Sequence, residues 1–191
     1  WLIECVKRPQ PLLKYDFSRG IPSEATTLVV IPVIWSTVRE VQTLVSRLEL
    51  HYLANRDANL HFALLVDLTD SDVESSPRDY EVNEAARTNI EALNRTYGTP
   101  GGSTFSLFQR RRTWNDSEGV WMGWERKRGA LVELVELLKG RTDTTCELVV
   151  GDPGILSHIR YVITLDADTQ LPIESARRMV GAMHLPYNRP R

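Results

Sequence analysis

The stretch Tyr161-Val-Ile-Thr-Leu-Asp-Ala-Asp-Thr-Gln-Leu-Pro172 decides the fold of this chain. It begins with an apolar run rich in β-branched residues and ends in two carboxylates that lie one residue apart. Such a run predicts a buried parallel strand over 159–165, with Asp166 and Asp168 at its C-terminal tip. Ligands of open α/β sheets bind at those tips. Two carboxylates there can hold a hard divalent cation, which in turn can hold a diphosphate.

Two other interpretations of the acidic pair stay open at the level of sequence. Asp166 and Asp168 could be solvated turn residues, or one of them could cap a helix that begins at Pro172. A second Asp-x-Asp match, Asp70-Ser71-Asp72, lies in a polar stretch that continues through Glu74-Ser-Ser-Pro77 and predicts a loop. Only the first match directly follows a strand-like run, and this favours a metal-dependent nucleotide-sugar site at that position.

The bulk composition restricts the class of protein. A chain of 191 residues forms one domain or a large part of one. Its net charge of −2 gives no reason to expect nucleic acid as a partner. Two cysteines, Cys5 and Cys146, do not make a disulfide framework, which favours a reducing compartment. A start at Trp1 without Met, and an end at Arg191 soon after an expected helix, indicate a chain truncated from a longer protein.

Hydrophobic spacing predicts strands that alternate with helices. Strands are expected over 27–34, 60–67, 103–109, 147–150 and 159–165. Helices are expected over 38–52, 80–97, 125–139 and 172–183, the last with Pro172 in its first turn. The run Arg110-Arg111-Arg112 is expected in a solvated loop. The alternation predicts an α/β fold, a three-layer, mostly parallel sheet with helices on both faces. Residues 1–25 form a lead-in, and 26–191 form the domain.

Two further groups are expected at the same edge of the sheet. Asp67 ends the second expected strand, where it is either a plain turn residue or an acceptor of hydrogen bonds from a uracil or a ribose. The triplet Arg126-Lys127-Arg128 opens the helix over 125–139, although helix N-termini favour anions. These cations call for an anionic partner such as a diphosphate; the alternative is a solvated turn partly neutralised by Glu125. The small Gly129 would allow close packing of this turn.

Several stretches of the chain resemble a known family, and the resemblance runs from about Thr26 to the C-terminus. The stretches that match, in order, are Thr27-Leu-Val-Val-Ile-Pro-Val, Leu64-Leu-Val-Asp67, Lys127-Arg-Gly-Ala-Leu131 and Tyr161-Val-Ile-Thr-Leu-Asp-Ala-Asp-Thr. They resemble processive inverting β-glycosyltransferases of the GT-A type. The strings Gly123-Trp-Glu-Arg-Lys-Arg-Gly129 and Leu165-Asp-Ala-Asp-Thr-Gln-Leu-Pro172 resemble more closely the glycosyltransferase region of cyclic β-1,2-glucan synthases.

The resemblance implies the Rossmann-like, nucleotide-binding half of a GT-A domain. It implies an inverting glucosyltransferase that takes glucose from UDP-glucose to a glucan acceptor with Mg²⁺ or Mn²⁺. It further implies a place on the cytoplasmic face of the inner membrane, within the remainder of a larger membrane-embedded synthase, the chain itself being soluble. The positions that match the donor site are Pro32 and Val33 beside the uracil, Asp67 on the uridine, Lys127 and Arg128 on the phosphates, and Asp166 and Asp168 on the metal.

The chain also departs from the family. Val132 stands where related enzymes often have Asn, and Asp70 is a rival of Asp67 for the nucleotide contact. The catalytic base and the aromatic acceptor motif of such enzymes are expected beyond Arg191, so no catalytic residue is expected in this chain. A non-catalytic nucleotide-binding or scaffold module therefore stays an alternative. A haloacid-dehalogenase-type phosphatase is another, although Gln170 stands where that class has Thr or Val.

Overall fold

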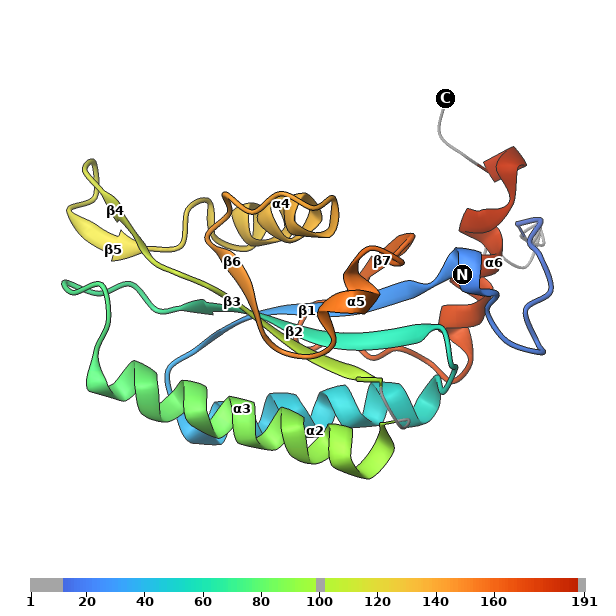
Figure 1. The fold of residues 1–191 in the computed structure, drawn as a ribbon, viewed down its shortest axis with the longest axis horizontal. Coiled ribbons are helices and arrows are strands. Elements are labelled where there is room, and N and C mark those ends of the chain that lie inside the picture. Colours follow the sequence, from blue (N-terminus) through green and yellow to red (C-terminus); the bar gives the residue numbers. More distant parts are fainter. Residues whose placement is uncertain (1–11, 99–101, 189–191) are drawn as a thin grey trace, which may run out of the picture.

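A five-stranded sheet in the order β6-β3-β2-β1-β7 forms the centre of the molecule (Figure 1). The structure is a computed structural model that describes residues 12–98 and 102–188. The strands of the sheet are β1 (Thr27–Trp35), β2 (Leu60–Leu68), β3 (Phe105–Arg110), β6 (Cys146–Val150) and β7 (Tyr161–Thr164). Four of them run parallel, and β6 pairs antiparallel with β3. The predicted α/β fold with a mostly parallel sheet is therefore confirmed.

Helices cover both faces of this sheet (Figure 1). The helices α2 (Val38–Ala54) and α3 (Pro77–Tyr97) pack on one face, and α4 (Arg126–Leu138) packs on the other. Successive side chains of β1 point to opposite faces, so Val29 and Ile31 enter the α2–α3 core while Leu28 and Val30 enter the α4 core. The remaining elements are η1 (Ser23–Ala25), β4 (Thr113–Asn115), β5 (Val120–Met122), α5 (Pro153–Leu156), α6 (Ser175–His184) and η2 (Pro186–Asn188).

Pro32 lies inside β1 without disrupting the sheet. The amide of Leu165 donates to the carbonyl of Val30 at 3.0 Å, so alternate residues of β1 turn their polar groups towards β7. Pro32, two residues further along, faces the same side, but β7 pairs only as far as Thr164. The N–H group that proline lacks therefore costs no ladder hydrogen bond, and this part of β1 is an open edge.

Most element boundaries agree with the sequence, and two helix starts differ. The helix α3 begins at Pro77 rather than at 80, because Ser76 and Asp79 form a capping box in front of it. The expectation that Pro172 lies in the first turn of the last helix is wrong, since α6 begins at Ser175 after a left-handed Glu174. Part of the lead-in over 1–25, together with Cys5, lies outside the described residues.

The expectation of a solvated loop around the arginine run is wrong. Arg110 is the last residue of β3, and Arg110 and Arg112 are both buried, while Arg111 alone is exposed. Alternation along an extended chain explains this pattern, because residues 110 and 112 share one side. The stretch after them forms an antiparallel hairpin of β4 and β5. Within the described residues, no helix is both long and apolar enough to cross a membrane.

Candidate functional site

The sheet changes its direction of winding between β1 and β7. From β1 the strand order runs through β2 to β3 on one side, whereas β7 pairs with β1 on the other. Open α/β sheets bind ligands at such a switch point, beyond the carboxyl ends of the strands. A cavity of about 600 Å³ opens at this place, and its lining includes Pro32, Val33, Arg47 and Ala167. Two of the positions matched to the family's donor site thus line a cavity at the switch point.

The acidic pair lies in a tight turn directly after β7. The amide of Thr169 donates to the carbonyl of Asp166 at 2.9 Å, which closes a four-residue turn. The Asp166 carboxylate forms an ion pair with Lys127 at the start of α4, and the two side chains are 63% and 49% exposed. On the other side of the sheet, Asp168 lines a cavity beside α2 with Arg47, whose guanidinium donates to the carbonyl of Ala167. Cations from both helix layers therefore flank the turn.

The basic first turn of α4 meets carboxylates of the protein itself. Arg126 forms a bidentate pair with Asp70, at 2.9 and 2.7 Å, while Lys127 contacts Asp166. Arg128 contacts Glu125 at 3.3 Å and is otherwise largely exposed. The anionic partners expected for this turn are thus supplied at least in part by the chain. Asp70, the predicted rival of Asp67, is engaged with Arg126.

Asp67 lies below this turn in a buried ion pair. Arg110 donates from Nε to Asp67 Oδ1 at 2.7 Å and from Nη2 to Asp67 Oδ2 at 2.6 Å, and the two residues are only 1% and 5% exposed. The same guanidinium donates to the carbonyls of Trp124 and Arg126 at 2.8 and 3.0 Å. Arg110 therefore ties β2 and β3 to the segment that leads into α4, which places Lys127.

Two glycines allow this close packing. A Cβ atom on Gly123 would lie 2.7 Å from Nη2 of Arg110 and 2.9 Å from Oδ2 of Asp67. A Cβ atom on Gly129 would lie 1.9 Å from the carbonyl oxygen of Trp124. The expected close approach of the turn at Gly129 is therefore found. Because Gly123 covers the Asp67–Arg110 pair, a ligand reaches the Asp67 carboxylate directly only if the Gly123 segment moves.

The backbone before Lys127 is strained. Glu125 and Arg126 have φ values of 51° and 49°, in the left-handed region that residues other than glycine rarely adopt. Such conformations cost of order 1–3 kcal/mol each and persist where surrounding contacts hold them. The hydrogen bonds from Arg110 to the carbonyls of Trp124 and Arg126 supply those contacts.

The carboxylates around the turn suit a divalent cation that is shared with a ligand. Among the described residues, no group of three or more His, Cys, Asp or Glu side chains is placed to hold a metal ion. Mg²⁺ sites of phosphate-handling enzymes commonly use one or two carboxylates, with substrate phosphates and waters completing the shell. Asp166 and Asp168 are ligands of the right type and both are exposed, but Asp166 contacts Lys127 on the α4 side of the sheet whereas Asp168 lines the cavity on the α2 side.

Cys146 is not a second reactive group near this site. Its thiol is buried on β6, and burial, with Glu133 adding to it, raises its pKa to about 12. The thiol is therefore protonated at neutral pH, and a protonated thiol is a poor nucleophile.

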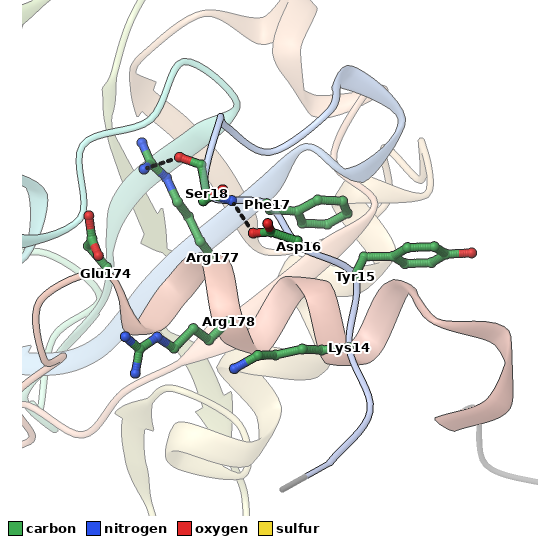
Figure 2. Close-up of a pocket in the computed structure, with 8 residues that line it drawn as sticks. All are labelled: Lys14, Tyr15, Asp16, Phe17, Ser18, Glu174, Arg177 and Arg178. Atoms are coloured by element: carbon green, nitrogen blue, oxygen red, sulfur yellow. Dashed lines mark hydrogen bonds between the residues drawn. The ribbon is translucent and has the colours of Figure 1, made fainter.

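A further hollow lies at the opposite end of the sheet (Figure 2). It measures about 300 Å³ and lies between residues 14–18 and the first turns of α6. Arg177 there donates to the carbonyl of Ser18 at 3.3 Å and to Asp57, just before β2, at 2.8 Å. None of the predicted site residues lines this hollow, so it is separate from the candidate site.

The sequence located part of this site and missed two arginines. Ala167 of the acidic turn lines the same cavity as Pro32 and Val33, and Lys127 contacts Asp166 of that turn. Arg47 was missed because a single Arg on an amphipathic helix carries no distinctive pattern. For Arg110 the available signal was its i, i+2 spacing from Arg112 directly after an apolar strand.

Comparison with known proteins finds a homologous segment in one much longer protein. No protein-family model matches it. It is 44% identical over 183 residues to the cyclic beta-(1,2)-glucan synthase NdvB of Rhizobium meliloti (strain 1021). The match covers 96% of this chain but only 6% of that protein's length. Identity at this level over nearly the whole chain shows that it is homologous to one segment of a cyclic β-(1,2)-glucan synthase, as its motifs predict.

Proposed function

We propose that this chain is the donor-binding part of a metal-dependent, inverting glucosyltransferase, which takes glucose from UDP-glucose to a growing β-1,2-glucan. The homologous protein is named as a synthase of cyclic β-(1,2)-glucan, which supports glucosyl transfer as the reaction class. The observation that carries the proposal is the contact between Lys127 and Asp166 at the switch point of the sheet. It unites two distant motifs at the edge where nucleotides bind in such sheets.

The residues have distinct roles in this proposal. Pro32 and Val33 form the wall beside the uracil, and Asp67 contacts the uridine when the Gly123 segment opens. Lys127, with Arg128 beside it, stabilises negative charge on the phosphates. Asp166 and Asp168 would hold Mg²⁺ or Mn²⁺, which supplies charge neutralisation as UDP leaves.

When the nucleotide binds, Lys127 exchanges its partner. In the described structure its ammonium contacts the Asp166 carboxylate. Asp166 would then hold the cation and Lys127 would stabilise the phosphate oxygens, so the contact between these two side chains would be replaced on binding.

The acceptor chemistry belongs to the remainder of a larger synthase. A carboxylate beyond Arg191 would take the proton from the 2-hydroxyl of the acceptor glucose, and attack from the opposite face would invert the anomeric carbon. We therefore expect the isolated chain to bind the donor nucleotide without elongating a glucan. In the full synthase this part would lie on the cytoplasmic face of the inner membrane.

Calorimetric titration of the chain with UDP, with and without Mn²⁺, tests the proposal. We expect binding that depends on Mn²⁺, and we expect Lys127→Ala and Asp166→Asn each to weaken it about tenfold, which equals about 1.4 kcal/mol. Lys139→Ala, at the far end of α4, is the matched control because it removes an exposed charge away from the turn and leaves the affinity unchanged. Binding that ignores Mn²⁺, or is insensitive to both site variants, would refute the proposal.

A further inference from the structure

The hairpin of β4 and β5 carries a pair of tryptophans on its outer face. Trp114 and Trp121 lie directly opposite each other, with ring centroids 5.9 Å apart and planes at 64°. Met122, the neighbour of Trp121 on β5, is only 6% exposed and turns towards the protein. Because side chains alternate along a strand, the tryptophan pair faces the other way, and Trp114 is 48% exposed. Neither ring belongs to either hydrophobic core.

This hairpin is fixed to the candidate site. Ser71, in the loop after β2, exchanges two backbone hydrogen bonds with Trp121, at 3.0 and 2.8 Å. At its other end β5 leads through Gly123 and Trp124 directly into the first turn of α4. Figure 1 shows the hairpin beyond the carboxyl ends of β2 and β3, on the side of the sheet that carries α4. A two-stranded hairpin is marginally stable alone, so these attachments hold the ring pair in place.

The surroundings of the rings indicate an uncharged ligand. The turn of the hairpin carries Asp116 and Glu118, both exposed, and Asp116 accepts a hydrogen bond from the indole N–H of Trp114 at 2.8 Å. These carboxylates repel nucleotides, nucleic acid and anionic lipid. They accept hydrogen bonds readily from hydroxyl groups. A flat apolar surface with acceptors at its edge suits a sugar ring, which has apolar C–H faces and a rim of hydroxyls.

We propose that the outer face of Trp114 and Trp121 binds the glucan acceptor by stacking against its sugar rings. The proposal rests on the proposed function, because it takes the acceptor from the glucan named for the homologous synthase. Trp114 and Trp121 form their contacts with each other, with Asp116 and with Ser71, and not with Lys127 or Asp166, so a glucan on the rings leaves the proposed nucleotide contacts unoccupied. A neutral polymer held beside the donor site keeps its growing end within reach of the sugar to be transferred.

Titration with a linear β-1,2-linked glucooligosaccharide, followed by the NMR signals of the indole N–H groups, tests this surface. We expect the signals of Trp114 and Trp121 to shift and that of the buried Trp35 to stay. Trp114→Ala raises the dissociation constant about tenfold, which equals about 1.4 kcal/mol, because the sugar loses its stacking surface. Trp114→Phe keeps a stacking ring and binds more tightly than Trp114→Ala. Tyr187→Ala removes an exposed aromatic ring on η2, which follows α6, and leaves the constant unchanged. Figure 1 shows α6 at the opposite end of the molecule from the hairpin.

The result that overturns the proposal is an indole spectrum of the unaltered chain that does not respond to the oligosaccharide. This spectrum is recorded on the unaltered chain, so it tests the proposal even if Trp114→Ala disturbs the hairpin. Indole shifts that depend on protein concentration without sugar would instead assign the face to contact between copies of the chain. Lys127→Ala separates the two proposals, because it weakens UDP binding and leaves glucan binding intact. Glucan binding with no UDP binding would reject the donor site alone.

Discussion

Arg110 determines the shape of the candidate site more than any residue that is exposed within it. Its guanidinium binds the Asp67 carboxylate and two backbone carbonyls of the segment before Lys127. A neighbouring arginine, Arg112, donates to Asp79 at 2.7 and 3.0 Å and to the carbonyl of Thr69 at 2.7 Å, which fixes the loop after β2. Both arginines are buried, and Arg112 also lines a small cavity beyond the ends of β1 and β2 with Asp70 and Asp79.

Replacement of Arg110 by Met is expected to destabilise the fold strongly. The change leaves the Asp67 carboxylate buried without its partner, and breaking a buried pair in this way costs about 3–5 kcal/mol. Urea denaturation measures the loss in the free energy of unfolding. Arg111→Met, on the exposed neighbour, serves as the control and should stay within about 0.5 kcal/mol of the unaltered chain. Equal stability of the two variants would contradict the role given to Arg110.

The stability of the chain should fall when the pH drops through the titration of His51. This side chain is buried at the end of α2, and its Nδ1 accepts a hydrogen bond from the amide of Leu171 at 3.3 Å. Burial, with the charge of Arg47 adding to it, lowers the pKa of His51. The unfolded chain therefore binds a proton at His51 more readily than the folded chain does. The contribution of neutral His51 to the free energy of unfolding is fully present above the unfolded pKa of about 6.5 and is lost as pH falls through the folded pKa.

Urea denaturation between pH 7 and pH 5.5 checks this linkage. We expect the free energy of unfolding to decrease over that range in the unaltered chain. His51→Gln keeps an acceptor for the Leu171 amide without a titrating ring, so its stability should depend less steeply on pH. Identical pH slopes in the two proteins would show that His51 does not contribute.

At the scale of elements, the start predicted for α2 at residue 38 agrees with the structure. The helix α2 begins behind Thr37, which forms a capping box with Glu40. The helix α3 also begins behind such a box, yet its start was predicted three residues late. The start of α6 was missed, because Asn55, the residue that caps the end of α2, donates to the carbonyls of Leu171 and Pro172 and accepts from the amide of Ala176 across 116 to 121 residues. A contact over that separation leaves no local trace in the sequence.

Gly129→Ala tests how closely α4 must approach the sheet. The new Cβ atom would overlap the carbonyl of Trp124 and would lie 2.8 Å from Nη1 of Arg110. Overpacking of this kind costs about 1–3 kcal/mol. Thermal denaturation should show the loss, and UDP should bind more weakly because the helix start that carries Lys127 shifts. Gly154→Ala, whose Cβ atom would meet only an Asp152 side chain at 3.1 Å, is the matched control. A Gly129→Ala chain as stable as the control would refute this packing.

At the scale of the whole molecule, the sequence predicted the alternation of strands and helices and the edge at which the site lies. Both follow from periodicity and from the polar residues that end β2 and β7. The antiparallel direction of β6, the β4–β5 hairpin and the burial of Arg110 were not predictable in the same way. Each depends on partners far along the chain, and a charged run is most often a solvated surface. The metal and nucleotide roles of Asp67, Lys127, Asp166 and Asp168 stay predictions.

In the proposed donor site, one nucleotide and one divalent cation bind at the turn between Asp166 and Asp168. Paramagnetic Mn²⁺ broadens the NMR signals of nearby nuclei, so a titration of the chain with Mn²⁺ in the presence of UDP locates the cation directly. We expect selective loss of the backbone amide signals of residues 166–168 and of Lys127, and recovery of these signals on chelation of the metal. Broadening centred on residues 14–18 and α6, or no selective broadening when UDP is present, would contradict it.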